Sequence, residues 1–292
     1  MLFDIRLKLS HRYAQPAGNG RHLLRVVPAS IAGRQRLLAH LVEVEPQPDE
    51  RTEGLDFFGN RMQSISHLEP HREMVIKMAC RVEQLVQPQQ LDVSPDLARL
   101  RAEWGESSDL TPLSPLHFLG PSPRLTETAE ISAFARAHVD PGQSAMANFI
   151  RIGHALYEAM TFDSEATTVD TDASEAFALR RGVCQDFSHI LILALRSLGI
   201  PAAYVSGYLR TLPPPGKPRL EGVDAMHAWV KAWCGEAQGW VEYDPTNATL
   251  VGPDHIVVGY GRDYSDVCPI IGQMRSAGGQ TNKQSVDVVV AG

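Results

Sequence analysis

The period of the hydrophobic pattern changes along this chain, and that change limits the folds it can adopt. Up to about residue 83, short runs such as residues 2–9 and 41–45 alternate apolar and polar residues, as half-buried strands do. From Thr126 onward the apolar residues recur every three or four positions, which is the period of amphipathic helices. The stretch between the two patterns is interrupted by prolines: Pro88, Pro95, Pro112, Pro115, Pro121 and Pro123.

The sequence therefore predicts an α+β chain with three parts. We expect residues 1–85 to form an antiparallel β-sandwich-like domain and residues 86–125 to form a linker or wrapping segment. Residues 126–292 would then form a core in which helices pack on an antiparallel sheet.

A cysteine lies at the start of a predicted helix in residues 181–190. Gly182 supplies a turn, and Cys184 opens an apolar helix that Gly199 and Pro201 end. The unpaired backbone N–H groups and the dipole of a helix N-terminus favour the thiolate, which is the form that attacks carbonyls. Cys184 is therefore a candidate nucleophile; a buried structural cysteine is the alternative.

Three strands are predicted after this helix, at residues 202–209, 226–233 and 239–243, with a proline-rich loop at residues 212–218. Gly235 and Gly239 bracket the last connection and favour a hairpin. Residues 285–290 predict a further strand near the end of the chain.

The same strands carry two partners that a thiol nucleophile needs. His227 lies on the second predicted strand, where an imidazole can take up the thiol proton, and Asp244 ends the third, where a carboxylate can orient the imidazole. Antiparallel neighbours bring such residues within one or two strand spacings. The alternatives are a packed strand histidine and simple Asp-Pro turn chemistry at Asp244 and Pro245.

Four motifs together resemble the transglutaminase-like superfamily, and in particular bacterial members with a β-rich N-terminal region that are often described as candidate cysteine proteases. The motifs are Gly-Val-Cys-Gln-Asp-Phe-Ser-His at 182–189, Gly-Ile-Pro-Ala-Ala-Tyr-Val-Ser-Gly-Tyr at 199–208, Met-His-Ala-Trp-Val at 226–230 and Gly-Trp-Val-Glu-Tyr-Asp-Pro-Thr-Asn at 239–247. The resemblance implies a papain-like fold in which Cys184, His227 and Asp244 match the family's triad.

The resemblance implies acyl transfer through a thioester. The family includes peptidases, amidases, protein crosslinkers and members without demonstrated activity. We expect hydrolysis of a peptide, protein or small amide substrate. Isopeptide formation with a lysine or other amine is one alternative, and a catalytically silent binding module is another. The oligomeric state is not indicated.

Acyl transfer also needs hydrogen-bond donors for the developing oxyanion. The backbone N–H of Cys184 is one candidate. Papain relatives place a glutamine six residues before the cysteine, and this chain has Ala178 there. The remaining oxyanion or cleft candidates are Gln185, Tyr157, Tyr204 and Trp229. Asp186 is expected to cap the helix rather than to take part in catalysis.

Composition excludes several classes of partner. The net charge is −7 and no basic stripe occurs, so we expect neither nucleic acid nor an anionic membrane as a partner. No apolar run reaches the roughly 18 to 20 residues of a membrane span, and the charged residues 1–8 argue against a signal peptide, which favours the cytoplasm. The four cysteines show no paired spacing and no calcium-loop pattern occurs, so neither a metal nor another cofactor is expected.

Overall fold

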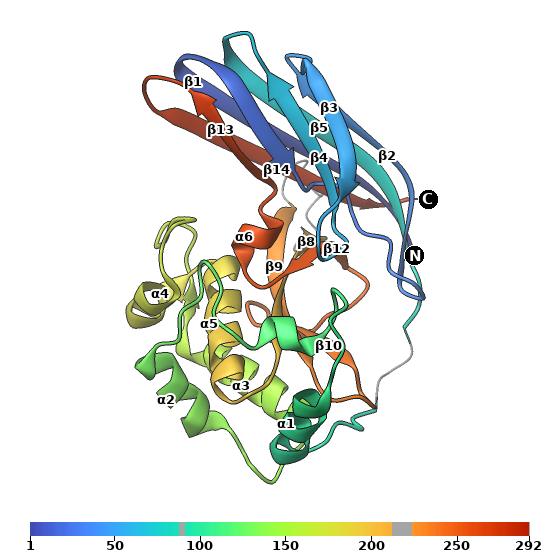
Figure 1. Ribbon diagram of the computed structural model, residues 1–292, viewed down its shortest axis with the longest axis vertical. Helices are drawn as coiled ribbons and strands as arrows, with labels where there is room; N and C mark the ends of the chain where they lie inside the picture. The colour runs from blue at the N-terminus through green and yellow to red at the C-terminus, as the bar shows by residue number, and fades with distance from the viewer. Residues whose placement is uncertain (88–90, 212–223, 292) are drawn as a thin grey trace, which may run out of the picture.

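The computed structural model describes residues 1–87, 91–211 and 224–291, so the loop predicted at residues 212–218 lies outside the described residues. A curled antiparallel sheet packs on a core of helices and a second sheet (Figure 1). The curled sheet has the order β2-β5-β1-β4-β3, with β13 and β14 also paired to β1. Its strands are β1 (Leu2–Leu24), β2 (Gln35–Glu45), β3 (Glu50–Leu55), β4 (Arg61–His67), β5 (His71–Gln84), β13 (Ile270–Arg275) and β14 (Gln280–Val290).

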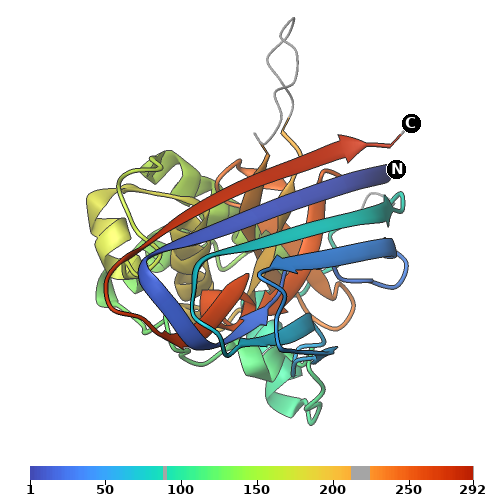
Figure 2. The ribbon, with the colours of Figure 1, turned by 90° about the horizontal axis from the view of Figure 1, so that it is seen from above.

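The long strand β1 holds the curled sheet together. Its first half pairs with β5 and β14, whereas its second half pairs with β4 and β13. The pairing with β5 shifts register between Arg12 and Ala17, where the ribbon turns sharply (Figure 2). Alternate residues, among them Phe3, Ile5 and Leu7, are buried on the inner face, as the alternating sequence pattern predicts.

The core contains a five-stranded antiparallel sheet of order β11-β10-β9-β8-β12. Its strands are β8 (Ala202–Leu209), β9 (Ala225–Trp233), β10 (Trp240–Asp244), β11 (Thr249–Leu250) and β12 (His255–Gly261). The helices are α1 (Leu97–Glu106), η1 (Pro115–Phe118), α2 (Ala129–His138), α3 (Ala145–Ala159), α4 (Ala173–Leu179), α5 (Cys184–Ser197) and α6 (Tyr264–Val267). Two short parallel strands, β6 (Thr161–Phe162) and β7 (Arg181–Gly182), precede α5.

Helix α5 is the central element of the core, because residues on all its sides are buried. It packs against β8 and β9 on one side and against α2, α3 and α4 on the others. The predicted helix start at Cys184, the strands on either side of Gly235 and Gly239, and their antiparallel pairing are confirmed. The α+β class, with a nucleophile helix packed on an antiparallel sheet, is confirmed as well.

The two last strands return to the sheet of the N-terminal region. Strand β14, which includes the predicted run 285–290, pairs with β1 from Phe3↔Val290 to Tyr13↔Gln280. Val286 and Val288 are buried in the same apolar cluster as the inner face of β1. The first and last strands of the chain therefore lie side by side (Figure 2).

Side-chain amides from the curled-sheet region cover the free edge of β12. Gln35 donates to the Val257 carbonyl at 2.8 Å and accepts from the Val257 N–H at 2.8 Å. Asn60 forms the same pair of bonds with Tyr260, each at 2.8 Å. These amides pair the polar backbone groups of an edge strand, so the two parts of the molecule share a hydrogen-bonded contact.

Among the described residues, no helix is long and apolar enough to cross a membrane.

Candidate functional site

Cys184 occupies the first position of α5, and the residues around it explain why the helix begins there. The Asp186 carboxylate accepts a hydrogen bond from the Val183 N–H at 2.8 Å and one from the Thr167 hydroxyl at 2.6 Å. A Cβ on Gly182 would lie 2.5 Å from Asp186 Oδ2, so glycine is needed for this close approach. The capping role predicted for Asp186 is confirmed. Cys184 is half-buried and not in a disulfide.

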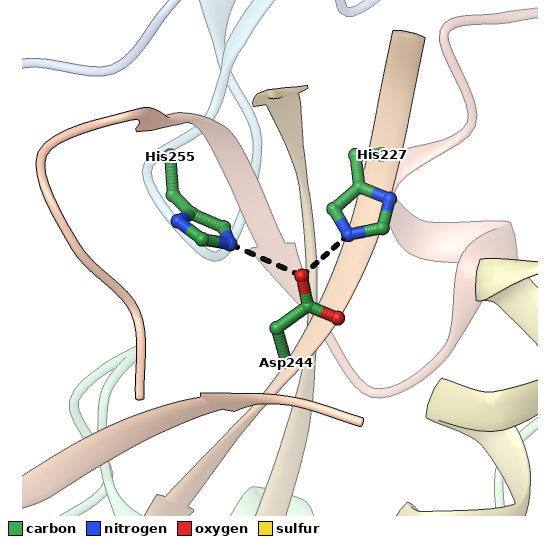
Figure 3. A group of neighbouring side chains, drawn as sticks. All are labelled: His227, Asp244 and His255. Atoms are coloured by element: carbon green, nitrogen blue, oxygen red, sulfur yellow. Dashed lines mark hydrogen bonds and ion pairs between the residues drawn. The ribbon is translucent and has the colours of Figure 1, made fainter. Parts of the chain in front are cut away.

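Strands β9 and β10 bring His227 and Asp244 together. Tyr243 pairs with Val230 in the antiparallel ladder, which places the end of β10 beside the first half of β9. His227 Nε2 lies 2.7 Å from Asp244 Oδ2, and both side chains are buried (Figure 3). Because a carboxylate is a hydrogen-bond acceptor, the imidazole donates from Nε2 and leaves Nδ1 for another partner.

A second histidine contacts the same carboxylate. His255 Nε2 lies 3.1 Å from Asp244 Oδ2 (Figure 3), and His255 Nδ1 accepts from the Gly252 N–H at 3.4 Å. These two bonds fit a neutral imidazole with its proton on Nε2. No sequence motif marks His255, so it was not predicted: it opens β12, and β8 and β9 separate β12 from β10 in the sheet.

Asp244 is held by the turn that follows it as well. Its Oδ1 accepts from the backbone N–H groups of Thr246 and Asn247, and its Oδ2 accepts from the Asn247 side chain at 2.7 Å. Burial opposes ionisation of Asp244, but the hydrogen bonds from His227 and His255 outweigh it and hold the pKa of Asp244 far below its usual range. The carboxylate is therefore ionised and fixed in position.

The electrostatics of His227 link the carboxylate to the thiol. Burial disfavours protonation of His227, yet the hydrogen bonds to Asp244 and to Cys184 raise its pKa to about 10. Nε2 faces Asp244, which leaves Nδ1 as the ring nitrogen available to a thiol. The contact with Asp244 and the effect of Cys184 on the pKa of His227 are what the order thiol, imidazole, carboxylate would give.

The four oxyanion or cleft candidates lie in different surroundings. Gln185 donates to the Val169 carbonyl at 3.0 Å, and the Trp229 indole donates to Glu242 at 2.7 Å, so both groups already have acceptors. Tyr157 is exposed on α3, where its ring stacks on His154. Tyr204 is buried, and its hydroxyl makes no hydrogen bond among the described residues.

Of the four candidates, Tyr204 is the one whose pKa the charge of the Cys184 thiol affects. Burial raises the pKa of Tyr204 well above its ordinary value, and the charge of Cys184 is the next cause. Its ring contacts the rings of His189 and Tyr264, at 5.2 and 6.2 Å between centroids. The backbone N–H of Cys184 also lacks an acceptor among the described residues, as first-turn N–H groups usually do.

His227, Asp244 and His255 also form a group that could hold a metal ion, because their ligand atoms all lie within 4.8 Å of one another. An ion bound there would displace the Nε2 protons that His227 and His255 donate to Asp244, because a histidine nitrogen binds a metal through its lone pair. The three residues could therefore hold a metal ion or position the His227 imidazole, and their hydrogen bonds already satisfy the buried Asp244 carboxylate.

Comparison with protein families assigns both parts of the chain. Residues 3–83 match the bacterial transglutaminase-like N-terminal region, and residues 132–245 match the transglutaminase-like superfamily. The second match begins in α2 and ends just after Asp244, so it contains Cys184, His227 and Asp244.

Relatives of similar length occur in mycobacteria. An uncharacterized protein of Mycobacterium tuberculosis is 36% identical over 253 residues, covering 82% of this chain and 77% of the relative. One of Mycobacterium leprae is 30% identical over 285 residues, covering 95% and 93%. A crystal structure from Cytophaga hutchinsonii, described as a "putative cysteine protease", has a TM-score of 0.76 at 21% identity and covers 99% of this chain and 90% of that chain.

Proposed function

The chain belongs to the transglutaminase-like superfamily, and from this we propose that it is a thiol-dependent acyl-transfer enzyme that hydrolyses a peptide or carboxamide bond. The observation that carries the proposal is the 2.7 Å contact between His227 Nε2 and Asp244 Oδ2, which leaves His227 Nδ1 for Cys184, whose hydrogen bond and charge help to raise the pKa of His227. The description of the Cytophaga hutchinsonii protein, which has the same fold, agrees with this reaction class.

In the proposed reaction the Cys184 thiolate attacks the carbonyl carbon and forms a tetrahedral intermediate. The Cys184 N–H and the Tyr204 hydroxyl donate to its oxyanion. The C–N bond then breaks, and the His227 imidazolium gives its proton to the leaving amine. Water attacks the resulting thioester while His227 accepts a proton from it, and the acid product leaves as the Cys184–His227 ion pair forms again.

Asp244 and His255 act as positioning residues in this scheme. Asp244 keeps the His227 ring in the tautomer that presents Nδ1 to the sulfur. His255 donates to the same Asp244 oxygen and so restricts the rotation of the carboxylate. No organic cofactor takes part in any step.

A screen of peptide and amide substrates with the full chain tests the proposal. Once a substrate is found, we expect Cys184→Ala to reduce turnover by at least about 1,000-fold, because the nucleophile is lost. Cys80→Ala is the matched control, since Cys80 is a free thiol on β5 in the curled sheet, and it should keep full turnover. Full turnover by Cys184→Ala would refute the mechanism.

Two alternatives share this site. An amine can resolve the same thioester and give an isopeptide bond, so incorporation of a labelled amine should be measured beside release of the leaving group. A silent binding module is the other alternative. Iodoacetamide labelling at pH 6, read by mass spectrometry, compares Cys184 with the half-buried Cys268 in one sample; equal rates would favour the silent module. A cytoplasmic location stays a prediction.

A further inference from the structure

Four histidines and a tyrosine form a buried cluster in the curled sheet, on both sides of the bend in β1. His11, Tyr13 and His22 lie on β1, His67 ends β4 and His71 begins β5. The His71 ring contacts the rings of His67 and Tyr13, with centroids 4.9 and 5.7 Å apart. We call these five residues the histidine cluster.

Each side chain of the histidine cluster has a buried polar atom without a hydrogen-bond partner. The atoms are His11 Nε2, the Tyr13 hydroxyl, His22 Nδ1, His67 Nδ1 and His71 Nε2, five of the nine such side-chain atoms among the described residues. Native proteins keep few of these atoms, because each one costs stability. They have almost no accessible surface, so a ligand does not reach them, and a proton reaches them when the sheet opens.

Oxygen acceptors fix the tautomers of three of the imidazoles. The contacts are His11 Nδ1 to the Asn282 side-chain oxygen at 2.8 Å, His67 Nε2 to the Pro46 carbonyl at 2.8 Å and His71 Nδ1 to the Glu69 carbonyl at 3.1 Å. Since these oxygens accept, the listed nitrogen donates and the other ring nitrogen carries a lone pair. Protonation of that other nitrogen would bury an N–H group without an acceptor and a charge without a partner.

The groups that face His22 do not balance a positive charge on its ring. The ionisable ones are His11 and Tyr13 of β1, His67 of β4, His71 of β5, Lys283 of β14, and Arg124, Tyr264 and Cys268 of the core, while β13 adds none to the shared cavity wall. Arg124 already pairs with Asp170. The carboxylates of the adjoining segments have other partners or are exposed: Asp49 accepts from the Leu68 N–H, Glu50 from the Ser66 hydroxyl, Glu73 pairs with Arg12, and Glu69 is exposed.

His22 gives the curled sheet a definite pH dependence. Burial and the neighbouring imidazoles of His67, His11 and His71 lower the pKa of His22 to about 4, whereas its pKa is near 6.5 in an unfolded segment. The opened state therefore binds a proton at a pH where the folded state does not. The stability that neutral His22 contributes is complete above about pH 6.5 and is lost as the pH falls towards 4, so the opening constant rises by up to about tenfold per pH unit.

The core has a buried histidine in different surroundings. Burial lowers the pKa of His189 on α5 to about 4, yet the charge of Asp263 acts in the opposite direction. His189 Nε2 also accepts from the Tyr264 N–H at 3.2 Å. A positive charge on His189 has a carboxylate nearby, whereas one on His22 faces other imidazoles, so the core should resist acid better than the curled sheet.

We propose that the histidine cluster is an acid-sensitive switch, which opens the curled sheet around β1, β4 and β13 below about pH 6 while the core stays folded. Met226 packs against the apolar cluster of the curled sheet and directly precedes His227 on β9, so opening removes support from His227. That this lowers turnover rests on the proposed function. The opening itself does not.

Hydrogen exchange of the full chain, read by mass spectrometry at pH 7 and pH 5, tests the switch without a substrate. Each rate is divided by the rate of the same peptide in urea at the same pH, which removes the chemical effect of pH on exchange. We expect the opening constant of residues 17–24, β4 and β13 to rise at least about tenfold, and that of α5 less than about threefold. Exchange should recover when the sample returns to pH 7. Equal rises in the sheet and in α5, or no rise, would overturn the proposal.

Three glutamine variants identify the histidines responsible. His22→Gln cannot take up the proton, so the rise between pH 7 and pH 5 should stay below about threefold. His67→Gln keeps an amide for the Pro46 carbonyl but removes a neighbouring charge, so it should give an intermediate rise, and it carries the test alone if His22→Gln does not fold. His40→Gln is the matched control, because His40 is exposed on β2, and it should respond like the unsubstituted protein. An undiminished rise in His67→Gln and in folded His22→Gln would refute the role of the cluster.

The two proposals fail separately. Local opening of the curled sheet at pH 5 without turnover at any pH would keep the switch and reject the enzyme. Turnover that depends on Cys184, with the sheet and α5 opening equally at pH 5, would do the reverse.

Discussion

At the scale of single residues, Tyr204 stands out because its side chain is buried, the charge of Cys184 affects its pKa, and its hydroxyl has no hydrogen-bond acceptor among the described residues. If it donates to the oxyanion, Tyr204→Phe should lower kcat by about 100-fold, the size of effect that the loss of one oxyanion donor has in other enzymes. KM should change less than about threefold, because the bond forms mainly in the transition state.

Steady-state kinetics on the substrate found by screening, with Tyr208→Phe as the control, measures this effect. Tyr208 is a buried tyrosine on the same strand, β8, but its hydroxyl bonds to Val26 in the direction of the curled sheet. Its loss should lower stability by about 1 kcal/mol without changing kcat. Equal kcat values for the two variants would remove Tyr204 from the oxyanion site.

His227 gives the stability of the protein a characteristic pH dependence. Its pKa is about 10 in the folded protein and near the ordinary 6.5 in the unfolded chain, so the folded state binds the extra proton between these values. The contribution of His227 is complete below about pH 6.5 and is lost as the pH rises through 10. Because the proposed ion pair also takes a proton from Cys184, the net slope stays small until the thiol of the unfolded chain ionises near pH 8.5; above that pH we expect the free energy of unfolding to fall by up to about 1.4 kcal/mol per pH unit.

Urea titrations between pH 6 and 10 check this slope, with His227→Gln as the comparison. The variant keeps an amide near Asp244 but cannot bind the proton, so its stability should change less with pH. Parallel curves for the two proteins would contradict the contact order of thiol, imidazole and carboxylate. Asp244 has the opposite sign, because its lowered pKa gives stability that is lost in acid.

At the scale of elements, the covered edge of β12 connects the curled sheet to His255. Gln35 bonds to both backbone groups of Val257 and accepts from Gln84, which also donates to the His255 carbonyl. Gln35→Leu leaves the Val257 N–H buried without a partner, and we expect the free energy of unfolding to fall by about 2 to 4 kcal/mol. His255 should then be held less precisely against Asp244, and this should also lower kcat.

The matched control is Gln63→Leu on β4. Gln63 is buried to a similar degree, but its bonds go to Arg51 and Glu53 within the curled sheet. It should lose stability without a comparable loss of kcat. If both variants keep the same kcat, the covered edge of β12 is a structural contact alone.

The elements of the site differ in how far their sequence determines them. The start of α5 could be predicted because Gly182, Cys184 and Asp186 act within one helical turn, and the hairpin of β9 and β10 because Gly235 and Gly239 adopt positive φ values of 97° and 71°. His255 could not be predicted. Its contact with Asp244 depends on the strand order, which brings the start of β12 to the end of β10 although two strands lie between them.

At the scale of the whole molecule, the same limit applies to the C-terminal strands. The pattern of residues 285–290 predicts a strand but not its partner, and the pairing with β1 arises from burial of Val286 and Val288 against the inner face of the curled sheet. The partly buried ion pair of Arg34 and Glu242 likewise joins segments 208 residues apart. Such long-range contacts depend on how complete surfaces fit together, which local patterns do not encode.

These contacts predict that the curled sheet and the core unfold as one cooperative unit, although the sequence divides the chain at about residues 85 and 125. All four tryptophans, Trp104, Trp229, Trp233 and Trp240, lie in the core, and Trp229 belongs to a cluster that also includes Ala29 and Ile31, so their fluorescence reports mainly on the core. Hydrogen exchange measured on peptides from β1 and β14 reports on the curled sheet. In a urea titration the two signals should share one midpoint, as two-state unfolding requires.

Gln35→Leu weakens the contact between the two parts and should separate the midpoints, whereas Gln63→Leu should shift both together. Two separate midpoints in the unsubstituted protein would instead show that the curled sheet folds by itself, and the alignment of His255 would then not depend on it.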